Sequence, residues 1–186
     1  LEIIHKETLN DLKQDEELVA NSNKELAFLY WEMIYTELSH ESLKTNFLNS
    51  VILYLRSAKE YYLPKVDELS LEIEELKKTY VQEQDGTNRV AEQEYELQSL
   101  YKICSNLYML MGKVYMKQGN YEEAREEFTI AQELVAGEDT FIIPYLAEVY
   151  YESGRYNIVK SVLKTAKGLE LNATLFPIMN QWRASA

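Results

Sequence analysis

Histidine, cysteine and paired carboxylates are the residue types in this chain that could support catalysis or bind a metal. The sequence holds two histidines, His5 and His40, and one cysteine, Cys104. Neither histidine has a cysteine or another histidine at the spacing of a zinc site. Cys104 is flanked by apolar residues, which predicts a small buried side chain and not a nucleophile. We therefore expect no metal site, and a single cysteine excludes an internal disulfide.

The glutamates are the other candidates for chemistry. The stretch EIEELKK at 72–78 sets opposite charges one helical turn apart, which is typical of ion pairs on a helix surface and not of paired catalytic carboxylates. The 6 glycines are isolated, so no glycine-rich loop is available to cradle a phosphate. The sequence thus predicts a protein that is not an enzyme and needs no cofactor.

Charge narrows the range of partners. The formal net charge is −12, and residues 67–96 hold ten acidic and three basic side chains. This balance excludes a nucleic-acid backbone as the expected partner, because such proteins concentrate lysine and arginine on one face. The acidic segment is either a solvated helix face or a docking surface for a basic partner. No apolar run is long enough to span a bilayer, and the cytoplasm is slightly favoured as the compartment.

The elements that must position these residues are helices, since 6 Gly and 3 Pro leave little material for the turns of a β fold. Residues 1–20 have a weak helical pattern, and residues 23–38 a firmer one. The next helix covers about 43–63 and is expected to form an antiparallel hairpin with 23–38. Pro64 is expected to interrupt the helix, after which a narrow apolar stripe resumes over 66–80.

Two features lie between this region and the carboxyl-terminal half. Asp85-Gly86-Thr87-Asn88 predicts a turn. Apolar residues then recur at helical spacing, a pattern equally compatible with one long helix over 88–118 and with two helices meeting near Ser105.

The carboxyl-terminal half repeats itself. The stretch MGKVYMKQGNYEEAREEF at 111–128 is followed by AEVYYESGRYNIVKSVL at 147–163, with Gly119 and Gly154 in corresponding places. Both glycines are expected to take the left-handed conformation that ends a helix. In the first copy Asn120 and Glu123 have the spacing of a capping box. Arg155, in place of Asn120, is a poor cap and predicts a less stable second turn.

The repeated stretch resembles the tetratricopeptide repeat, a helix–turn–helix of about 34 residues. The first copy matches the family signature at Tyr108, Met111, Gly112, Tyr115, Ala124, Phe128 and Ala131, with Ala136 in place of proline. The second, looser copy matches at Ile143, Leu146, Ala147, Tyr150, Val159, Leu163 and Ala166, with Leu171 in place of proline.

The resemblance implies an all-α solenoid of antiparallel helix pairs. In this interpretation residues 1–84 form an amino-terminal helical region that includes the hairpin, and 85–104 form the second helix of a degenerate repeat. The repeats occupy 105–138 and 139–173, and a carboxyl-terminal helix over 174–186 caps the stack because the last pair cannot bury its apolar face alone.

The resemblance also implies a non-catalytic adaptor that binds a peptide or helix of another protein in a groove lined by the first helices. The matching groove positions are Asn106, Met109, Lys113, Met116, Lys117, Phe141, Pro144, Glu148, Tyr151 and Glu152. Methionine and aromatic side chains suit such contacts, although Met109 and Met116 could instead pack against neighbouring helices. Some family members hold acidic tails with a lysine–asparagine–arginine clamp; this chain lacks most of that set, and we expect no such binding.

Two alternatives stay open. The chain could be a regulatory domain that senses a short signalling peptide, as some receptors with these repeats do. It could also associate with a second copy of itself through its amino-terminal helices.

Overall fold

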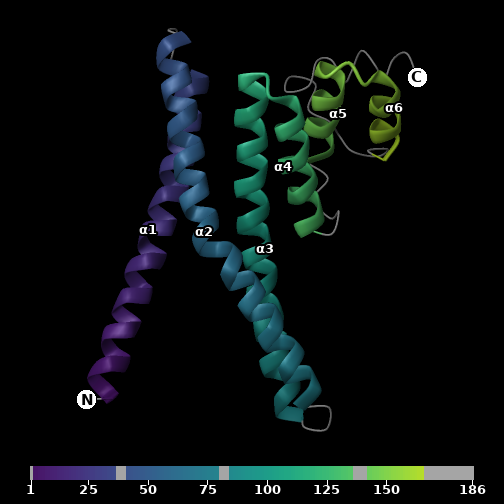
Figure 1. The fold of residues 1–186 in the computed structure, drawn as a ribbon. Helices are drawn as coiled ribbons and strands as arrows, with labels where there is room; N and C mark the ends of the chain where they lie inside the picture. Colours follow the sequence, from purple (N-terminus) through teal and green to yellow (C-terminus); the bar gives the residue numbers. More distant parts are fainter. Residues whose placement is uncertain (1, 37–40, 80–83, 136–141, 166–186) are drawn as a thin grey trace. The chain divides into compact units, whose positions relative to one another are not determined.

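A computed structural model describes residues 2–36, 41–79, 84–135 and 142–165, which form six helices and no strand. These helices, drawn in Figure 1, are α1 (Glu2–Thr36), α2 (Glu41–Thr79), α3 (Gln84–Gln118), α4 (Tyr121–Leu134), α5 (Ile142–Glu152) and α6 (Tyr156–Thr165). The prediction of an all-α chain is confirmed. The chain divides into two compact units, residues 1–107 and 108–186, so α3 contributes to both. The expected capping helix over 174–186 lies outside the described residues.

The first unit opens with the predicted antiparallel hairpin, formed by α1 and α2. The Tyr62 hydroxyl donates a hydrogen bond to the Asn21 side-chain oxygen at 2.6 Å, and Asn23 donates to Ser57 at 3.0 Å. As the residue number increases along α1, the number of the partner residue on α2 decreases. The two helices are therefore antiparallel. The core of the hairpin comes from Ala20, Ala27 and Ile34 of α1 and from Leu48, Val51, Leu55, Ala58 and Tyr62 of α2.

The helix α1 is longer and more regular than its sequence suggests, because the weak segment 1–20 and the firmer segment 23–38 form one continuous element that ends at Thr36. The polar residues between them would usually favour a break, since their side chains compete for backbone groups. Here Asn21 and Asn23 bond to α2, and the Ser22 hydroxyl bonds back to the Leu18 carbonyl at 2.8 Å. The polar side chains therefore support the helix.

Pro64 does not interrupt the helix, and this part of the sequence prediction is wrong. The helix α2 continues through Pro64 to Thr79. Its apolar face is unbroken, because Tyr62 and Val66 are both buried while Pro64 is on the exposed side. Proline lacks the N–H that would bond to the preceding turn and usually bends a helix that tolerates it. Figure 1 shows α2 changing direction along its length.

The turn expected at residues 85–88 is also displaced. The helix α2 ends at Thr79 and α3 begins at Gln84, so Asp85 to Asn88 lie within the first turns of α3. Aspartate, asparagine and threonine favour helix starts as well as turns, and the pattern alone did not separate these cases. The helices α2 and α3 are linked by ion pairs, one between Lys77 and Glu94 and one between Arg89 and Glu72 at 3.8 Å.

The question left open about residues 88–118 is answered by α3, which runs as a single helix to Gln118. Ser105 is buried inside this helix and marks no break. Residues 85–104 are therefore continuous with the first helix of the repeat and do not form a separate second helix.

The second unit contains the end of α3 followed by α4, α5 and α6. Phe128 fills the space over Gly112: a Cβ atom at Gly112 would lie 2.7 Å from the Phe128 ring. The absence of a side chain at Gly112 thus admits the ring of Phe128, the most bulky of the fully buried side chains. The core of this unit is formed by Met111, Val114, Ala124, Phe128, Ala131, Ile142, Leu146, Ala147, Val149 and Val159.

Candidate functional site

The turns of the two copies have the same geometry. The Asn120 N–H donates to the Tyr115 carbonyl at 2.9 Å, and the Gly119 N–H donates to the Met116 carbonyl at 3.1 Å. This pair of bonds is the Schellman ending of a helix. Gly119 has φ of +77°, which confirms the left-handed conformation expected for it.

The second turn reproduces the first. The Arg155 N–H donates to the Tyr150 carbonyl at 2.8 Å, and the Gly154 N–H to the Tyr151 carbonyl at 2.9 Å. Gly154 has φ of +74°. The helices α3 and α5 therefore end by the same motif, and α4 and α6 leave these turns in the same local way.

The predicted capping box is not formed. Asn120 stands at the N-cap of α4 with ψ of 71° and makes no side-chain hydrogen bond to the helix start. Its amide nitrogen lies 3.5 Å from the Gln118 side-chain oxygen instead. The first turn thus gains no cap from Asn120, and the expected difference in capping between the turns disappears.

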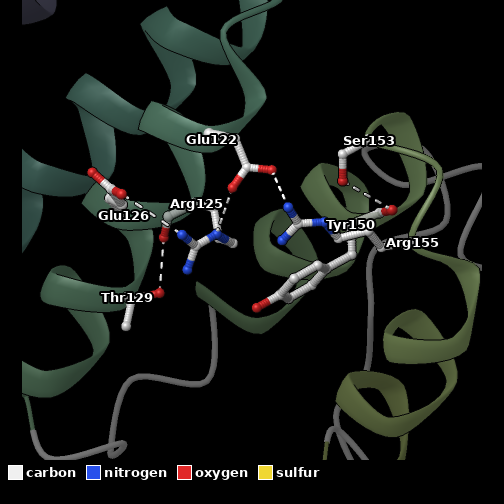
Figure 2. A network of polar contacts seen from close by, with 7 residues as sticks. All are labelled: Glu122, Arg125, Glu126, Thr129, Tyr150, Ser153 and Arg155. Carbon is white, nitrogen blue, oxygen red and sulfur yellow. Dashed lines mark hydrogen bonds and ion pairs between the residues drawn. The ribbon is translucent and has the colours of Figure 1, made fainter.

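Arg155 has a different role from the one its position suggests. Figure 2 shows the Glu122 carboxylate between two guanidinium groups, those of Arg125 and Arg155. Arg125 is on α4 three residues after Glu122, at 3.2 Å, whereas Arg155 comes from the turn before α6. The hydrogen bond to Glu122 is the main reason why the pKa of Arg125 is raised. Glu122 therefore bridges the two helix pairs through charge-assisted hydrogen bonds.

The first helices of the two pairs also meet through their side chains. The Lys113 ammonium of α3 lies 4.5 Å from the centre of the Tyr145 ring of α5, in a cation–π contact. One turn further along both helices, Lys117 is close enough to Glu148 to favour its charged form. The matching order of these contacts means that the two helices run in the same direction here. Their facing residues form one surface, which we call the α3–α5 surface.

Burial and charge perturb two groups of this surface. Burial raises the pKa of Tyr145, and the nearby Glu148 carboxylate raises it further. Burial also raises the pKa of Glu148; Lys117 opposes this effect and the second carboxylate, Glu152, adds to it. The environment of Glu148 thus disfavours its charge even though a lysine is nearby.

The predicted groove residues differ in their surroundings. Lys113, Met109, Met116 and Glu148 are half-buried, whereas Lys117 and Glu152 are exposed. Asn106 is exposed and belongs to the first unit. Phe141 lies outside the described residues, and Pro144 is buried.

Tyr151 packs within its own helix pair. It contacts the buried cluster of Ala147 and Val159, and its ring meets Tyr156 of α6 edge-on at 5.4 Å. The side chain therefore helps to hold α5 against α6.

The sequence interpretation missed Tyr145, which lies at the centre of the α3–α5 surface. Its ring is stacked on Phe128 at 5.5 Å with an interplanar angle of 21°. Helical spacing was the available signal, because Tyr145 precedes Glu148 by one turn and shares its face.

Side chains that could perform chemistry do not gather in the described part of the chain. The described residues contain no group of three or more histidine, cysteine, aspartate or glutamate side chains arranged for a metal ion. Cys104 is buried, and this burial raises the pKa of its thiol to about 11. The thiolate needed for nucleophilic attack is therefore scarce at neutral pH. No described helix has the length and apolarity required to cross a membrane.

A family comparison decides what the first of these helix pairs is. The model of the tetratricopeptide repeat matches residues 105–135, which cover the end of α3, the turn at Gly119 and all of α4. Over these residues the chain is similar to the tetratricopeptide repeat. No curated protein and no solved structure matches it.

The match identifies the roles of the helices in this part of the chain. In a tetratricopeptide repeat the end of α3 is the first helix and α4 is the second. Proteins of this family typically act by binding other proteins, and they are typically non-catalytic. The α3–α5 surface joins the first helix of the matched repeat to the first helix of the next pair.

Proposed function

We propose that this protein is a non-catalytic adaptor that binds a peptide or helix of another protein on the α3–α5 surface. The observation that supports the proposal is the contact of Lys113 with Tyr145, which links α3 to α5. The surface combines half-buried methionine and tyrosine side chains with lysines and glutamates. Adaptable apolar contacts surrounded by charge suit a helix or an extended peptide.

The geometry alters the choice of residues for a test. Tyr151 supports the packing of α5 on α6, so its substitution would confuse folding with binding. Met116 and Glu148 are better targets, because both are only half-buried on the α3–α5 surface. A double variant, Met116→Ala with Glu148→Lys, removes one apolar contact and reverses one charge.

The test is affinity capture from native extract followed by mass spectrometry, with a matched control on α6. Ile158→Ala with Lys160→Glu makes the same two kinds of change at exposed positions of that helix. We expect the Met116 and Glu148 double variant to lose partners that the wild type and the α6 variant both retain. Equal retention by all three proteins would refute binding on this surface, and circular dichroism checks that each variant is folded.

A further inference from the structure

The α3–α5 surface already holds a cation on an aromatic ring. The Tyr145 ring is stacked on Phe128 at 5.5 Å, and the Lys113 ammonium lies 4.5 Å from its centre. Phe128 is fully buried and Tyr145 is half-buried, so the ring is fixed by the core while part of it faces the surface. A fixed aromatic ring attracts a cation through its quadrupole, and this attraction strengthens as water is excluded.

One carboxylate, that of Glu148, lies near this ring. Glu148 follows Tyr145 by one helical turn and is itself half-buried, and Glu152 follows Glu148 by another turn. The two carboxylates repel one another, and burial adds to the cost of charging Glu148. The opposing effect of Lys117 is smaller than that of burial. A second cation near Glu148 would therefore be favoured.

We propose that Tyr145 and Glu148 form a subsite for a cationic side chain, which Lys113 occupies in the free protein and which an arginine of the partner takes over. The proposal rests on the proposed function and specifies its chemistry. Arginine suits the site better than lysine, since its planar guanidinium can stack on the ring while it donates to a carboxylate. The net charge of −12 would also favour the approach of a basic segment.

Displacement is possible because the Lys113 ammonium is at the end of a flexible side chain that comes from α3 and not from α5. When a guanidinium covers the ring, the Lys113 ammonium can move into water. Lys113 is thus an internal competitor in the free protein. A partner binds only if its cation interacts with the Tyr145 ring more strongly than Lys113 does, so weakly basic segments bind poorly. Removal of the competitor should strengthen the binding of arginine.

The experiment is a titration of the full chain followed by amide chemical shifts, with N-acetyl-arginine amide as the probe. N-acetyl-citrulline amide is the matched control, because it has nearly the same shape without the charge. We expect only the arginine probe to shift the Tyr145 and Glu148 signals. Lys113→Met should strengthen its binding by about three- to fivefold, the size of one cation–π contact at a partly exposed site. Glu148→Gln should weaken it by a similar factor.

Lys160→Met serves as the control for loss of a lysine, since Lys160 is exposed on α6. It should leave the affinity unchanged. Equal shifts from the arginine and citrulline probes would overturn the subsite. Weaker binding by Lys113→Met would do so too, as would shifts confined to the acidic segment 67–96.

The two proposals fail in different ways. If partners are lost from the Met116 and Glu148 double variant but the arginine probe does not bind, the adaptor surface stands and the subsite is wrong. If the probe binds as expected but the double variant retains every partner, the subsite stands and the adaptor function on this surface is wrong.

Discussion

Gly112 shows how a single hydrogen atom in place of a side chain determines the packing of a repeat. Its missing Cβ leaves room for the Phe128 ring, which in turn supports Tyr145 on the α3–α5 surface. The second copy has Ala147 and Leu163 at the corresponding positions.

We expect Gly112→Ala to lower the free energy of unfolding by about 1–3 kcal/mol, because the added methyl group overlaps a ring that the core holds in place. At an unhindered helix position the same change would stabilise by about 1 kcal/mol. Urea denaturation measures the difference.

The control is the same change made together with Phe128→Leu, because leucine is the residue that the second copy has at this place in the sequence. In that background the added methyl group should cost little or stabilise. An unchanged cost of Gly112→Ala in both backgrounds would show that its clash is not with Phe128.

A second prediction at this scale concerns pH. The pKa of Glu148 is raised in the folded protein, so the folded state binds this proton more tightly than the unfolded state. Below the unfolded pKa the carboxyl group is protonated in both states and does not affect the free energy of unfolding. As pH rises through the unfolded and then the folded pKa, ionisation favours the unfolded state and the free energy of unfolding falls. We expect Glu148→Gln to stabilise the protein at pH 7 and to have a smaller effect at pH 4.

Thermal unfolding at several pH values measures this difference. Glu152→Gln is the comparison, because Glu152 is exposed on the same helix. A stabilisation by Glu148→Gln that is the same at pH 4 and pH 7 would contradict the proposed origin.

At the scale of the element, the turns at Gly119 and Gly154 require glycine because of its positive φ and not because a side chain would clash with a neighbouring atom. No atom lies within 4 Å of a Cβ built at either glycine. Gly119→Ala and Gly154→Ala should each lower the free energy of unfolding by about 1–2 kcal/mol, the cost of an L-residue in the left-handed region. Urea denaturation should give similar values for the two turns.

Asn120→Ala is the informative control, since Asn120 makes no capping bond. Its effect should stay within about 0.5 kcal/mol. A loss near 1 kcal/mol would mean that Asn120 caps α4 in solution after all.

The sequence predicted the repeat well because its rules are local. Glycine at the end of α3 and α5 has a conformational reason, and apolar spacing defines the buried faces of α4 and α5. The long helices were predicted less well. Whether Pro64 ends or bends α2, and whether Asp85–Asn88 turn or start α3, depends on packing against another helix, which the local pattern does not contain.

The same limit applies to the α3–α5 surface. Family positions indicated Lys113 and Glu148, but the role of Tyr145 depends on its stacking with Phe128 from another helix. The residue type of Arg155 indicated only a poor cap, whereas its contact with Glu122 of the preceding helix pair could not be predicted from local spacing. The roles of these side chains depend on contacts between helices, which the spacing within one helix does not reveal.

At the scale of the whole molecule, the chain has two compact units with cores of their own. Leu55 is fully buried in the first unit and Leu146 is buried in the second. We expect Leu55→Ala to weaken hydrogen-exchange protection mainly in α1 and α2. Leu146→Ala should weaken it mainly in α5 and α6, and each change should lower local stability by about 2–5 kcal/mol.

Exchange measured by mass spectrometry on the full chain distinguishes the units, and each variant serves as the control for the other. A uniform loss of protection along the chain from either substitution would show that the molecule unfolds as a single cooperative unit.

The open space around Gly119 and Gly154 has a consequence for chirality. A position that needs positive φ and tolerates a methyl group suits a D-amino acid as well as it disfavours an L-amino acid. A protein assembled by chemical ligation with D-alanine at either position should keep its turn. It should also gain stability, because D-alanine restricts the unfolded chain more than glycine does. Mirror-image residues would thus tighten both turns of the repeated unit without adding a single contact.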